Sequence, residues 1–457
     1  MDNWAVEPAP TPPAIDLEAL AARAAAASTR ERCWDLLDEV RRPEVLRRID
    51  DDGAVDLWCA RILDLIDRSD LTMATLFSRR VREYGGKTLF ELPGPGGGTG
   101  VSWRQAALRV DAIARGLLAL AGGEARVAIV SGNRLEMALC DLACHAAGLV
   151  SILIPTSATE ADIAEILGLA GATVAVVSER EPVMAALRAR GAPRSTLAHV
   201  VAIGPHDGGS RVLPLDAVVA RAPEVRSETL EARRLAVRSG DLATIMYTSG
   251  TTGRPKGIRF SHRNLVFKRF ARALALPEIG PDDVFLCYLP LFHTFGRFFE
   301  MYGCIFWGAT YCFLDNPSVE ALVAGMRRYR PTVFISVPKK WMQVHEAIVR
   351  EADPDAKTDA EVGEAVRRLS GGRLRWGLSA AGHLDAEVFR FFQRHGVELM
   401  SGFGMTEATG GITMTRPGRY RDDSLGSALP GIELRIGERR VGKECYSPCR
   451  SRWSPYH

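Results

Sequence analysis

Residues 247–257 read Tyr-Thr-Ser-Gly-Thr-Thr-Gly-Arg-Pro-Lys-Gly and hold four Ser or Thr hydroxyls, three glycines and one lysine. Glycines allow successive backbone N–H groups to turn toward an anion, and the hydroxyls add further donors. Lys256 adds a mobile positive charge that suits a polyphosphate. A predicted strand precedes the run, and a helix is predicted to begin near His262. We therefore predict a phosphate-binding loop between a strand and a helix, with a polar surface turn as the alternative.

Strands and helices alternate on both sides of this run. Short apolar runs rich in β-branched residues predict strands at 126–130, 150–154, 173–177, 199–203, 243–247, 284–288, 309–313, 333–336, 374–379 and 397–401. Amphipathic patterns between them predict helices at 134–147, 160–170, 182–190, 262–275, 298–307, 318–329, 340–351 and 385–394. Such alternation predicts an α/β fold of two consecutive layers with parallel sheets covered on both faces, joined by a connector at 207–238.

The N-terminal part of the chain has a different pattern. A Pro-rich lead is followed by Ala-, Leu- and Arg-rich helical patterning at 17–27, 30–41 and 55–67. We interpret residues 1–70 as a helical extension packed on the main body, the alternative being a docking or regulatory segment. Beyond it, strand-like segments at 88–92 and 100–103 flank a Gly- and Pro-rich stretch, which predicts a hairpin loop rather than a phosphate cradle.

Two further runs carry groups suited to chemistry. Residues 401–407 read Ser-Gly-Phe-Gly-Met-Thr-Glu at the end of a predicted strand. Glu407 offers hard oxygen ligands for Mg²⁺, and the Thr406 hydroxyl is placed to meet a phosphate, although alone the pair is an ordinary strand-to-loop sequence. Residues 288–297 read Tyr-Leu-Pro-Leu-Phe-His-Thr-Phe-Gly-Arg, where His293 on its own is typical of a core or capping residue.

Taken together, the three runs resemble motifs of the adenylate-forming superfamily of acyl-CoA synthetases, luciferases and peptide-synthetase adenylation domains. Residues 248–257 look like its signature phosphate loop, and 401–407 are similar to its aromatic-Gly-x-Thr-Glu motif, with Phe403 where Tyr is more usual. Residues 288–297 resemble its Leu-Pro-x-x-His-x-x-Gly region. The resemblance runs from about Leu71 to Gly437. It implies two stacked α/β subdomains with mostly parallel sheets.

The resemblance also implies the residues of a site. Catalytic roles fall to Lys256, Thr406 and Glu407, and Mg²⁺ is expected on Thr248 and Glu407. The small-residue turn at 379–382 is expected against adenine. The nucleotide contacts implied are Thr248, Ser249, Gly250, Thr251, Thr252, Gly253, Lys256, Ala381, Gly382, Phe403, Gly404 and Thr406. The residues implied for an acyl pocket are His293, Phe295, Gly296 and Gly402.

The function implied is the activation of a carboxylic acid in two steps. A carboxylate attacks the α-phosphate of ATP with Mg²⁺ bound, and the thiol of coenzyme A then attacks the acyl-adenylate to give a thioester. Long-chain fatty acyl-CoA synthetases are the most similar members, and a set of aromatic residues suits either a long apolar tunnel or a plain core: Phe292, Phe295, Phe298, Phe299, Phe306 and Trp307. The alternatives are another carboxylic acid passed to a carrier-protein thiol, and a non-catalytic acyl- or nucleotide-binding protein.

The sequence departs from the family pattern near its C-terminus. Members continue with an Asp that holds the ribose hydroxyls, a hinge and a small domain bearing a catalytic Lys, for which we find no counterpart. We interpret residues 439–457 as a non-family tail and an artefactual end, the alternative being a genuine divergent tail. The chain as written is therefore expected to keep a nucleotide- and acyl-binding body but to adenylate poorly or not at all. The predicted domains are 1–70, 71–438 (with subdomains of about 71–238 and 239–438) and 439–457.

Composition excludes several other classes. With 457 residues, 58 Lys and Arg against 55 Asp and Glu, and 47% hydrophobic residues, the chain has neither the overall charge of a nucleic-acid-binding protein nor the composition of a disordered one. The nine cysteines are scattered, and Cys140 and Cys144 are expected to be buried packing thiols. No signal peptide or membrane-spanning run is visible, which predicts a cytoplasmic protein and leaves peripheral membrane contact and oligomeric state open.

Overall fold

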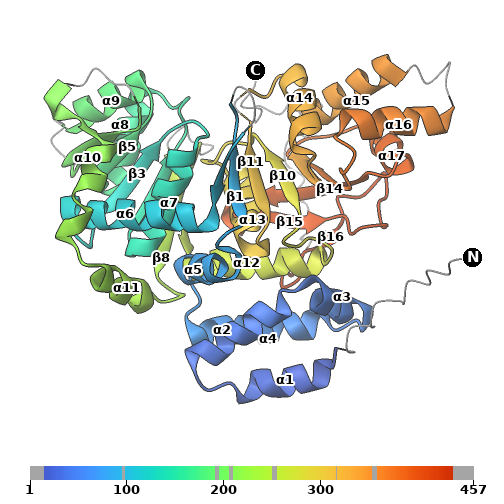
Figure 1. Cartoon of the computed structure of the whole chain (residues 1–457), viewed down its shortest axis with the longest axis horizontal. Coiled ribbons are helices and arrows are strands. Elements are labelled where there is room, and N and C mark those ends of the chain that lie inside the picture. Colours follow the sequence, from blue (N-terminus) through green and yellow to red (C-terminus); the bar gives the residue numbers. More distant parts are fainter. Residues whose placement is uncertain are drawn as a thin grey trace, which may run out of the picture.

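The computed structural model describes residues 15–94, 98–190, 195–204, 209–249, 255–314, 316–352 and 358–435. Two mostly parallel sheets form the body, with a layer of helices below them in Figure 1. The expected α/β class is confirmed. The segment 439–457 and Gly250, Thr251, Thr252 and Gly253 of the predicted phosphate loop lie outside the described residues.

A seven-stranded sheet has the order β7-β6-β5-β3-β4-β8-β9. All its pairings are parallel except the antiparallel pair β8–β9 at one edge. Its strands are β3 (Arg126–Val130), β4 (Val150–Ile154), β5 (Val174–Val177), β6 (His199–Ala202), β7 (Leu213–Pro214), β8 (Leu242–Ser249) and β9 (Pro255–Ser261). Its helices are α6 (Trp103–Ala121), α7 (Leu135–Ala147), α8 (Glu160–Ala170), α9 (Arg180–Arg190), α10 (Leu215–Ala220) and α11 (Ser227–Ala236).

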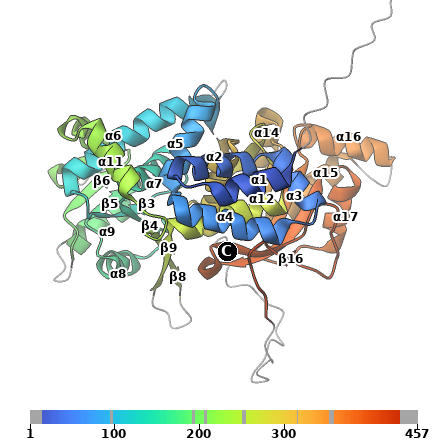
Figure 2. The same ribbon diagram turned by 90° about the horizontal axis from the view of Figure 1, so that it is seen from below.

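Both faces of this sheet are covered, as the continuous apolar strands require. Val127 and Ile129 of β3 pack into one core with residues of α6 and α7, whereas Ala128 and Val130 pack into a second core with residues of α8 and α9. Alternate side chains of a strand point to opposite faces, so the two cores lie on opposite sides. Figure 2 shows α6 and α7 on one side of the strands and α8 and α9 on the other.

A nine-stranded sheet has the order β16-β15-β14-β13-β12-β10-β11-β1-β2. Its strands are β1 (Thr88–Leu92), β2 (Thr99–Ser102), β10 (Val284–Cys287), β11 (Thr310–Phe313), β12 (Val333–Ser336), β13 (Trp376–Ala380), β14 (Glu398–Met405), β15 (Gly410–Met414) and β16 (Ser427–Ala428). Its helices are α13 (Tyr302–Trp307), α14 (Val319–Tyr329), α15 (Pro338–Ala352), α16 (Asp359–Leu369) and α17 (Ala386–Arg394).

We expected the division between the two subdomains at residues 238 and 239. Each sheet instead includes one pair of strands from the other side of that boundary. The β1–β2 pair, from the first half of the chain, forms one edge of the nine-stranded sheet. The β8–β9 pair, from the second half, forms one edge of the seven-stranded sheet. Strand pairing therefore links the two halves, which sequence order alone did not reveal.

The N-terminal helices lie beneath the body (Figure 1). They are α1 (Leu17–Ala26), α2 (Arg30–Val40), α3 (Pro43–Asp51), α4 (Val55–Ser69) and α5 (Met73–Tyr84). Both α3 and α4 pack on α12 (His262–Ala275) of the body. Ion pairs also cross this junction, with Arg263 Nε 2.6 Å from Asp67 Oδ1 and Arg47 Nη1 3.1 Å from Glu278 Oε2.

Several elements were not predicted, for identifiable reasons. Trp103 was assigned to the end of a strand but begins the long helix α6, whose N-terminus is fixed by a capping box of Ser102 and Gln105. β9 begins at Pro255 and was not expected between the phosphate loop and α12, because a proline reads as a break unless its strand lies at an edge. Helices α3, α5 and α16 and strands β15 and β16 were likewise missed.

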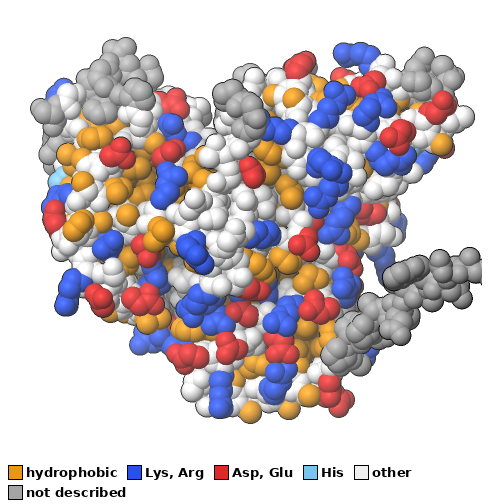
Figure 3. Space-filling view, viewed as in Figure 1, with side chains coloured by type: hydrophobic (Ala, Val, Ile, Leu, Met, Phe, Trp, Pro, Cys, Tyr) orange, Lys and Arg blue, Asp and Glu red, His pale blue; other side chains and the backbone are white. Residues whose placement is uncertain are grey.

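Most charged side chains lie on the surface and apolar side chains fill the core, as in a globular protein (Figure 3). Basic and acidic side chains are intermingled over the face shown in Figure 3. Cys140 and Cys144 are fully buried on α7, as expected for packing thiols, and burial raises the pKa of the Cys140 thiol to about 12. Among the described residues, no helix combines the length and the apolar character needed to cross a bilayer.

Candidate functional site

The predicted phosphate loop is the tip of a β-hairpin. Strands β8 and β9 are antiparallel, with Thr248 opposite Lys256 and Ser249 opposite Pro255. Directly opposite residues of an antiparallel pair place their side chains on the same face of the ribbon. The hairpin thus brings a half-buried hydroxyl at Thr248 and an exposed ammonium at Lys256 to one face, at the base of the loop that joins them.

The second predicted motif ends a strand of the other sheet. Phe403 in β14 is 50% exposed, and Glu407 is exposed on the short 3₁₀ turn Thr406–Ala408 that follows. A Cβ at Gly404 would lie 2.4 Å from the Gly410 carbonyl oxygen, so β14 and β15 approach too closely here for any other residue. Glycine therefore permits the tight ribbon that presents Thr406 and Glu407 at its end.

The small-residue turn after β13 holds a strained residue. Ala381 has φ 68°, in the left-handed region, where an L-residue costs about 1–2 kcal/mol. Ala380 of β13 is paired with Gly402 of β14, so this turn lies beside the start of the Phe403–Glu407 segment. Ala381 and Gly382 are both exposed there. Strain held in an exposed turn next to a predicted nucleotide site is the pattern found in ligand-contacting turns.

The acyl-pocket segment follows β10 and enters a π-helix, Phe295–Met301, before α13 begins. We expected a plain α-helix at 298–307; π-turns inside helices are frequent at functional sites. A Cβ at Gly296 would lie 2.4 Å from the Leu289 carbonyl oxygen, so the π-helix rests directly on the preceding loop. His293 is exposed, and its Nδ1 accepts a hydrogen bond from the Phe295 N–H at 3.2 Å.

Asn133, at the carboxyl end of β3, ties this segment to the other sheet. Its Nδ2 donates to the Leu289 carbonyl at 2.7 Å and to the Tyr288 carbonyl at 3.0 Å. Its Oδ1 accepts from the Leu291 N–H at 2.8 Å. One amide side chain thus holds three backbone groups of the loop that leads to His293. Asn133 was not among the site residues expected from the sequence.

Arg297 is a second link between the sheets. It is fully buried, and its Nε donates to Asp141 Oδ2 of α7 at 2.9 Å. Its Nη1 donates to Thr244 of β8 at 2.8 Å, and its Nη2 to Ser151 of β4 at 2.9 Å. Burial alone raises the pKa of Asp141, but the charge of Arg297 outweighs it and the net pKa lies below its usual value. Arg297, which directly follows Gly296, therefore links the π-helix to β8, the strand that carries Thr248.

Three buried cations lie on one face of α12; we call Lys268, Arg269 and Arg272 the α12 cation cluster. They are 7%, 2% and 3% exposed. Lys268 Nζ donates to the Gly411 carbonyl at 2.9 Å. All three Arg269 nitrogens and Arg272 Nη1 lack a hydrogen-bond partner among the described residues. Burial lowers the pKa of Lys268 to about 7, with further lowering by the two arginines.

The depressed pKa of Lys268 predicts how stability depends on pH. Because the pKa is about 7 in the folded chain and about 10.4 when unfolded, the unfolded state binds more protons between these values. Lys268 alone therefore contributes stability that rises by about 1–2 kcal/mol between pH 7 and 8.5. Because buried thiols such as Cys140 and Cys144 oppose this trend as unfolded thiols begin to ionise, the readout is the difference between two chains. Urea unfolding should show the parent gaining about 1–2 kcal/mol relative to Lys268→Met across this range. Equal slopes in both would contradict the assignment.

The aromatic set divides between core and site. Phe298, Phe306 and Trp307 are buried and pack edge-on or stacked against Phe260, Phe270 and Phe285. Phe292 and Phe295 are partly exposed, and Phe295 stacks on Phe299 with ring centroids 6.1 Å apart. Most of this set therefore builds the core, and Phe292, Phe295 and Phe299 remain beside the His293 segment.

The predicted residues thus form two groups. Thr248 and Lys256 lie together on the β8–β9 hairpin, with Ser249 in the same strand. The residues of the nine-stranded sheet follow the carboxyl ends of its parallel strands β10, β13 and β14, which line one edge. This second group comprises His293, Phe295, Gly296, Ala381, Gly382, Gly402, Phe403, Gly404, Thr406 and Glu407. Asn133 and Arg297 join the two sheets between these groups.

The fit to Mg²⁺ rests on Glu407. Its exposed carboxylate has no hydrogen bond or ion pair with another described residue, so both oxygens are available. Among the described residues, no three His, Cys, Asp or Glu side chains gather as a metal centre. Mg²⁺ commonly takes one or two carboxylates and completes its shell with water and substrate phosphates. Glu407 and the Thr248 hydroxyl suit that mode of binding.

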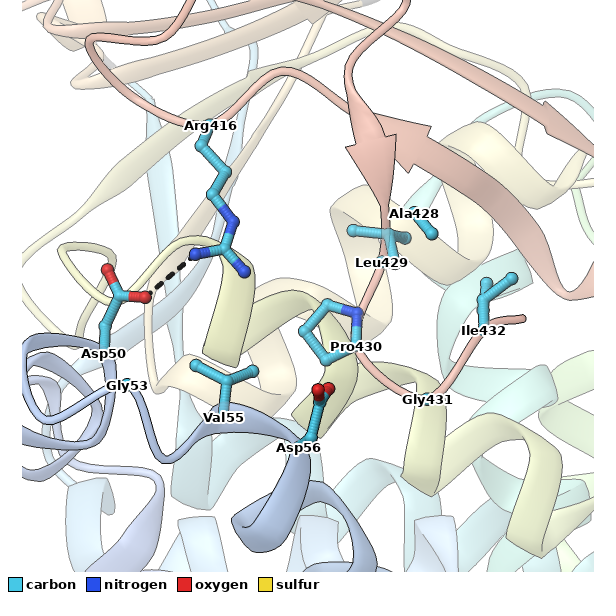
Figure 4. A pocket seen from close by; sticks show the side chains of 10 residues that line it. All are labelled: Asp50, Gly53, Val55, Asp56, Arg416, Ala428, Leu429, Pro430, Gly431 and Ile432. Atoms are coloured by element: carbon cyan, nitrogen blue, oxygen red, sulfur yellow. Dashed lines mark hydrogen bonds and ion pairs between the residues drawn. The ribbon is translucent and has the colours of Figure 1, made fainter. Parts of the chain in front are cut away.

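A surface pocket of about 340 Å³ lies elsewhere, at the junction with the N-terminal helices (Figure 4). It is bounded by Asp50, Val55 and Asp56 on one side and by Arg416 and the segment 428–432 on the other. Arg416 Nη1 reaches Asp50 Oδ1 at 3.0 Å. None of the predicted site residues lines this pocket, which belongs to the contact between α3–α4 and the body.

A family model described as AMP-binding enzyme matches residues 77–446, which reaches into the segment 439–457 that we expected to lack a family counterpart. Long-chain-fatty-acid–CoA ligase FadD15 of Mycobacterium tuberculosis (strain ATCC 25618 / H37Rv) is 28% identical over 74% of this chain and 61% of its own length. Long-chain-fatty-acid–CoA ligase ACSBG1 of Mus musculus is 25% identical over 87% of this chain and 62% of its own. The chain therefore spans about three fifths of these relatives.

Solved structures share the fold. The anthranilate CoA ligase AuaEII in complex with anthranoyl-AMP matches with a TM-score of 0.64 and 20% identity, covering 79% of this chain and 64% of that one. Apo MatB from Rhodopseudomonas palustris matches with a TM-score of 0.64 and 25% identity, covering 82% and 68%. The two-sheet body is thus the expected body of adenylate-forming enzymes.

Proposed function

The chain belongs to the family of AMP-binding enzymes, and on that premise we propose that it activates a long-chain fatty acid with ATP and transfers it to coenzyme A. The observation that carries the proposal is the β8–β9 hairpin, whose register places Thr248 and Lys256 on one face at the base of the signature loop. The names of the relatives FadD15 and ACSBG1 support the long-chain acid and the CoA acceptor.

In the first step, a carboxylate oxygen of the acid forms a bond to the α-phosphorus of ATP. The bond from that phosphorus to the bridging oxygen breaks, and pyrophosphate leaves. Lys256 and Thr248 would bind the phosphates and neutralise charge that develops on them, while Thr406 donates from the other sheet. Asn133 and Arg297 fix the position of one sheet relative to the other, so that the acid and the phosphates are held in a single orientation.

In the second step, the sulfur of coenzyme A forms a bond to the acyl carbon. The bond from that carbon to the AMP oxygen breaks, and the thiol proton passes to solvent. Bound at Glu407 and Thr248, Mg²⁺ would supply positive charge to the phosphate oxygens of the first step. Phe403 offers an exposed apolar plate beside this site for the adenine or the acyl group.

The test is ATP–pyrophosphate exchange, which reports the first step alone. Measurable exchange, even at a low rate, is expected with long-chain fatty acids, and none is expected without acid. Lys256→Ala is expected to reduce exchange on the order of 100-fold, since it removes a charge that stabilises the transition state. Arg367→Ala, which removes another exposed cation, on α16, is the matched control and should leave exchange unchanged.

The other outcomes separate the rival functions. Exchange with aromatic or short acids only would replace the long-chain substrate. Exchange followed by transfer to a carrier protein, but not to coenzyme A, would replace the acceptor. ATP binding that Lys256→Ala weakens, without exchange for any acid, would favour a binding protein.

A further inference from the structure

The positive charges of the α12 cation cluster have no negatively charged partner among the described residues. Arg297 shows how this fold accommodates a structural buried arginine: a carboxylate, two hydroxyls and a tyrosine surround it. Arg269 is as deeply buried, yet all three of its nitrogens lack a partner among the described residues. Arg272 has no ion pair within the described residues either, and its Nη1 is unpartnered.

Burying a guanidinium without a partner costs several kcal/mol, and a cation in that position normally has a counter-charge. Here the neighbours add to the cost, because Arg269 and Arg272 repel each other and both repel Lys268. Among the described residues, Lys268 bonds to a neutral carbonyl, that of Gly411, and to no carboxylate. Arg272 lies over the ring of Phe299, with its Cζ 4.1 Å from the centroid, which offsets part of the charge. An anion that binds beside Arg269 and Arg272 would supply the counter-charge that the described residues do not provide.

The cluster adjoins the predicted acyl pocket. Arg272 Nη2 would lie 2.8 Å from a Cβ placed on Gly410, and Thr294 would be 3.7 Å from that Cβ. Thr294 stands between His293 and Phe295. Gly410 is paired with Met405 and Gly411 with Gly404, so the same guanidinium lies next to the strand that ends in Thr406 and Glu407. A glycine at 410, with φ 93°, keeps the space beside the guanidinium free of a side chain.

We propose that the acid this protein activates carries a second anionic group, a carboxylate at the far end of its chain, which Arg272 and Arg269 bind. The substrate class is then a long-chain aliphatic dicarboxylic acid, which narrows the class of long-chain acids proposed above. This inference rests on the proposed function, because it places the reacting carboxylate at the β14 motif. Arg272 and Arg269 would bind the distal carboxylate, while Lys268 keeps its bond to the Gly411 carbonyl. Phe295 and Phe299, which stack on each other beside Arg272, would flank the methylene chain.

The test is equilibrium binding to the full chain by calorimetry, which needs no turnover. Three ligands of equal length serve as probes: dodecanedioate, its monomethyl ester and dodecanoate. Dodecanedioate is expected to bind at least 10-fold more tightly than the other two. Arg272→Met and Arg269→Met are each expected to abolish that preference. Arg263→Met, which removes a partly exposed cation that pairs with Asp67 at the start of the same helix, is the matched control and should retain it.

Two results would overturn the inference while leaving the proposed function in place. One is dodecanoate binding as tightly as dodecanedioate; the other is a preference for dodecanedioate that survives in both variants. Binding of none of the three, together with no pyrophosphate exchange, would overturn the proposed function and the inference with it.

The ligand-free stability provides a second readout. Since Arg272 is buried without a counter-charge, Arg272→Met is expected to raise the thermal midpoint of the ligand-free chain by several degrees. A fall of the same size would mark Arg272 as a structural residue and would overturn its role in binding.

Discussion

Asp141→Asn is expected to lower the free energy of unfolding by about 3–5 kcal/mol, the cost of leaving a buried charge without its partner. Asp141 and Arg297 are 1% and 0% exposed. Arg297 donates to Asp141 through two nitrogens, and Tyr302 adds a third bond to the same carboxylate at 2.7 Å. An asparagine of the same shape keeps the packing but removes the charge, so the buried guanidinium loses its counter-ion.

The midpoint of urea unfolding measures this loss. Asp423→Asn removes a carboxylate from an exposed ion pair with Arg421 and should leave the midpoint unchanged, because solvent screens such pairs. A change below 1 kcal/mol for Asp141→Asn would show that the hydroxyls of Thr244, Ser151 and Tyr302 suffice for Arg297. The variant also tests the coupling of the two sheets, since Arg297 links the π-helix Phe295–Met301 to β8.

Most of the sheet framework was predictable because its signals are local. Strands β1, β3, β4 and β12 have the predicted bounds, as do helices α8 and α12. Each is an apolar run or an amphipathic pattern with clear ends. What failed was pairing: the edge hairpins β1–β2 and β8–β9 each belong to the sheet of the opposite half of the chain. Such long-range pairing depends on tertiary packing, which local pattern does not encode.

The candidate site shows the same division. The motifs that carry chemistry were visible as runs of unusual residue types, so Thr248, Lys256, Thr406 and Glu407 were all singled out from the sequence. The residues that hold them were not, because Asn133 acts on a loop more than 150 residues away. A signal for Arg297 existed, since a charge between Phe295 and Phe298 must be satisfied wherever that segment is buried. Its partner Asp141 could be found only in three dimensions.

The same reasoning applies to α12, where the sequence pattern was read as a plain amphipathic helix. Lys268 and Arg272 are four residues apart and Arg269 and Arg272 three, so the three share a face. That face is covered, because Lys268 bonds to Gly411 of β15 and Arg272 lies over the ring of Phe299 in the π-helix. Charges that would be solvated on an isolated helix are therefore buried in the assembled chain.

Glu407→Gln is expected to weaken Mg²⁺-dependent binding of ATP by at least about 10–100-fold, the loss that follows removal of even an outer partner of a metal site. Glu407 is exposed at the end of β14, and its oxygens have no partner among the described residues. Glutamine keeps the size of the side chain but replaces the charged pair of oxygens by one neutral carbonyl, a poor ligand for a hard cation. The change should act on the metal-dependent part of binding alone.

Titration of ATP with and without MgCl₂ separates the two parts. In the parent chain Mg²⁺ should tighten binding, whereas in Glu407→Gln the two titrations should nearly coincide at the value of the metal-free parent. Glu387→Gln, an exposed carboxylate on α17 outside the predicted site, controls for the loss of one negative charge and should behave like the parent. If Mg²⁺ tightened binding equally in all three proteins, the metal would have to be held by ATP and Thr248 without Glu407. Thr248 lies on the other sheet, so that result would place the protein's contacts to the metal on the β8–β9 hairpin alone.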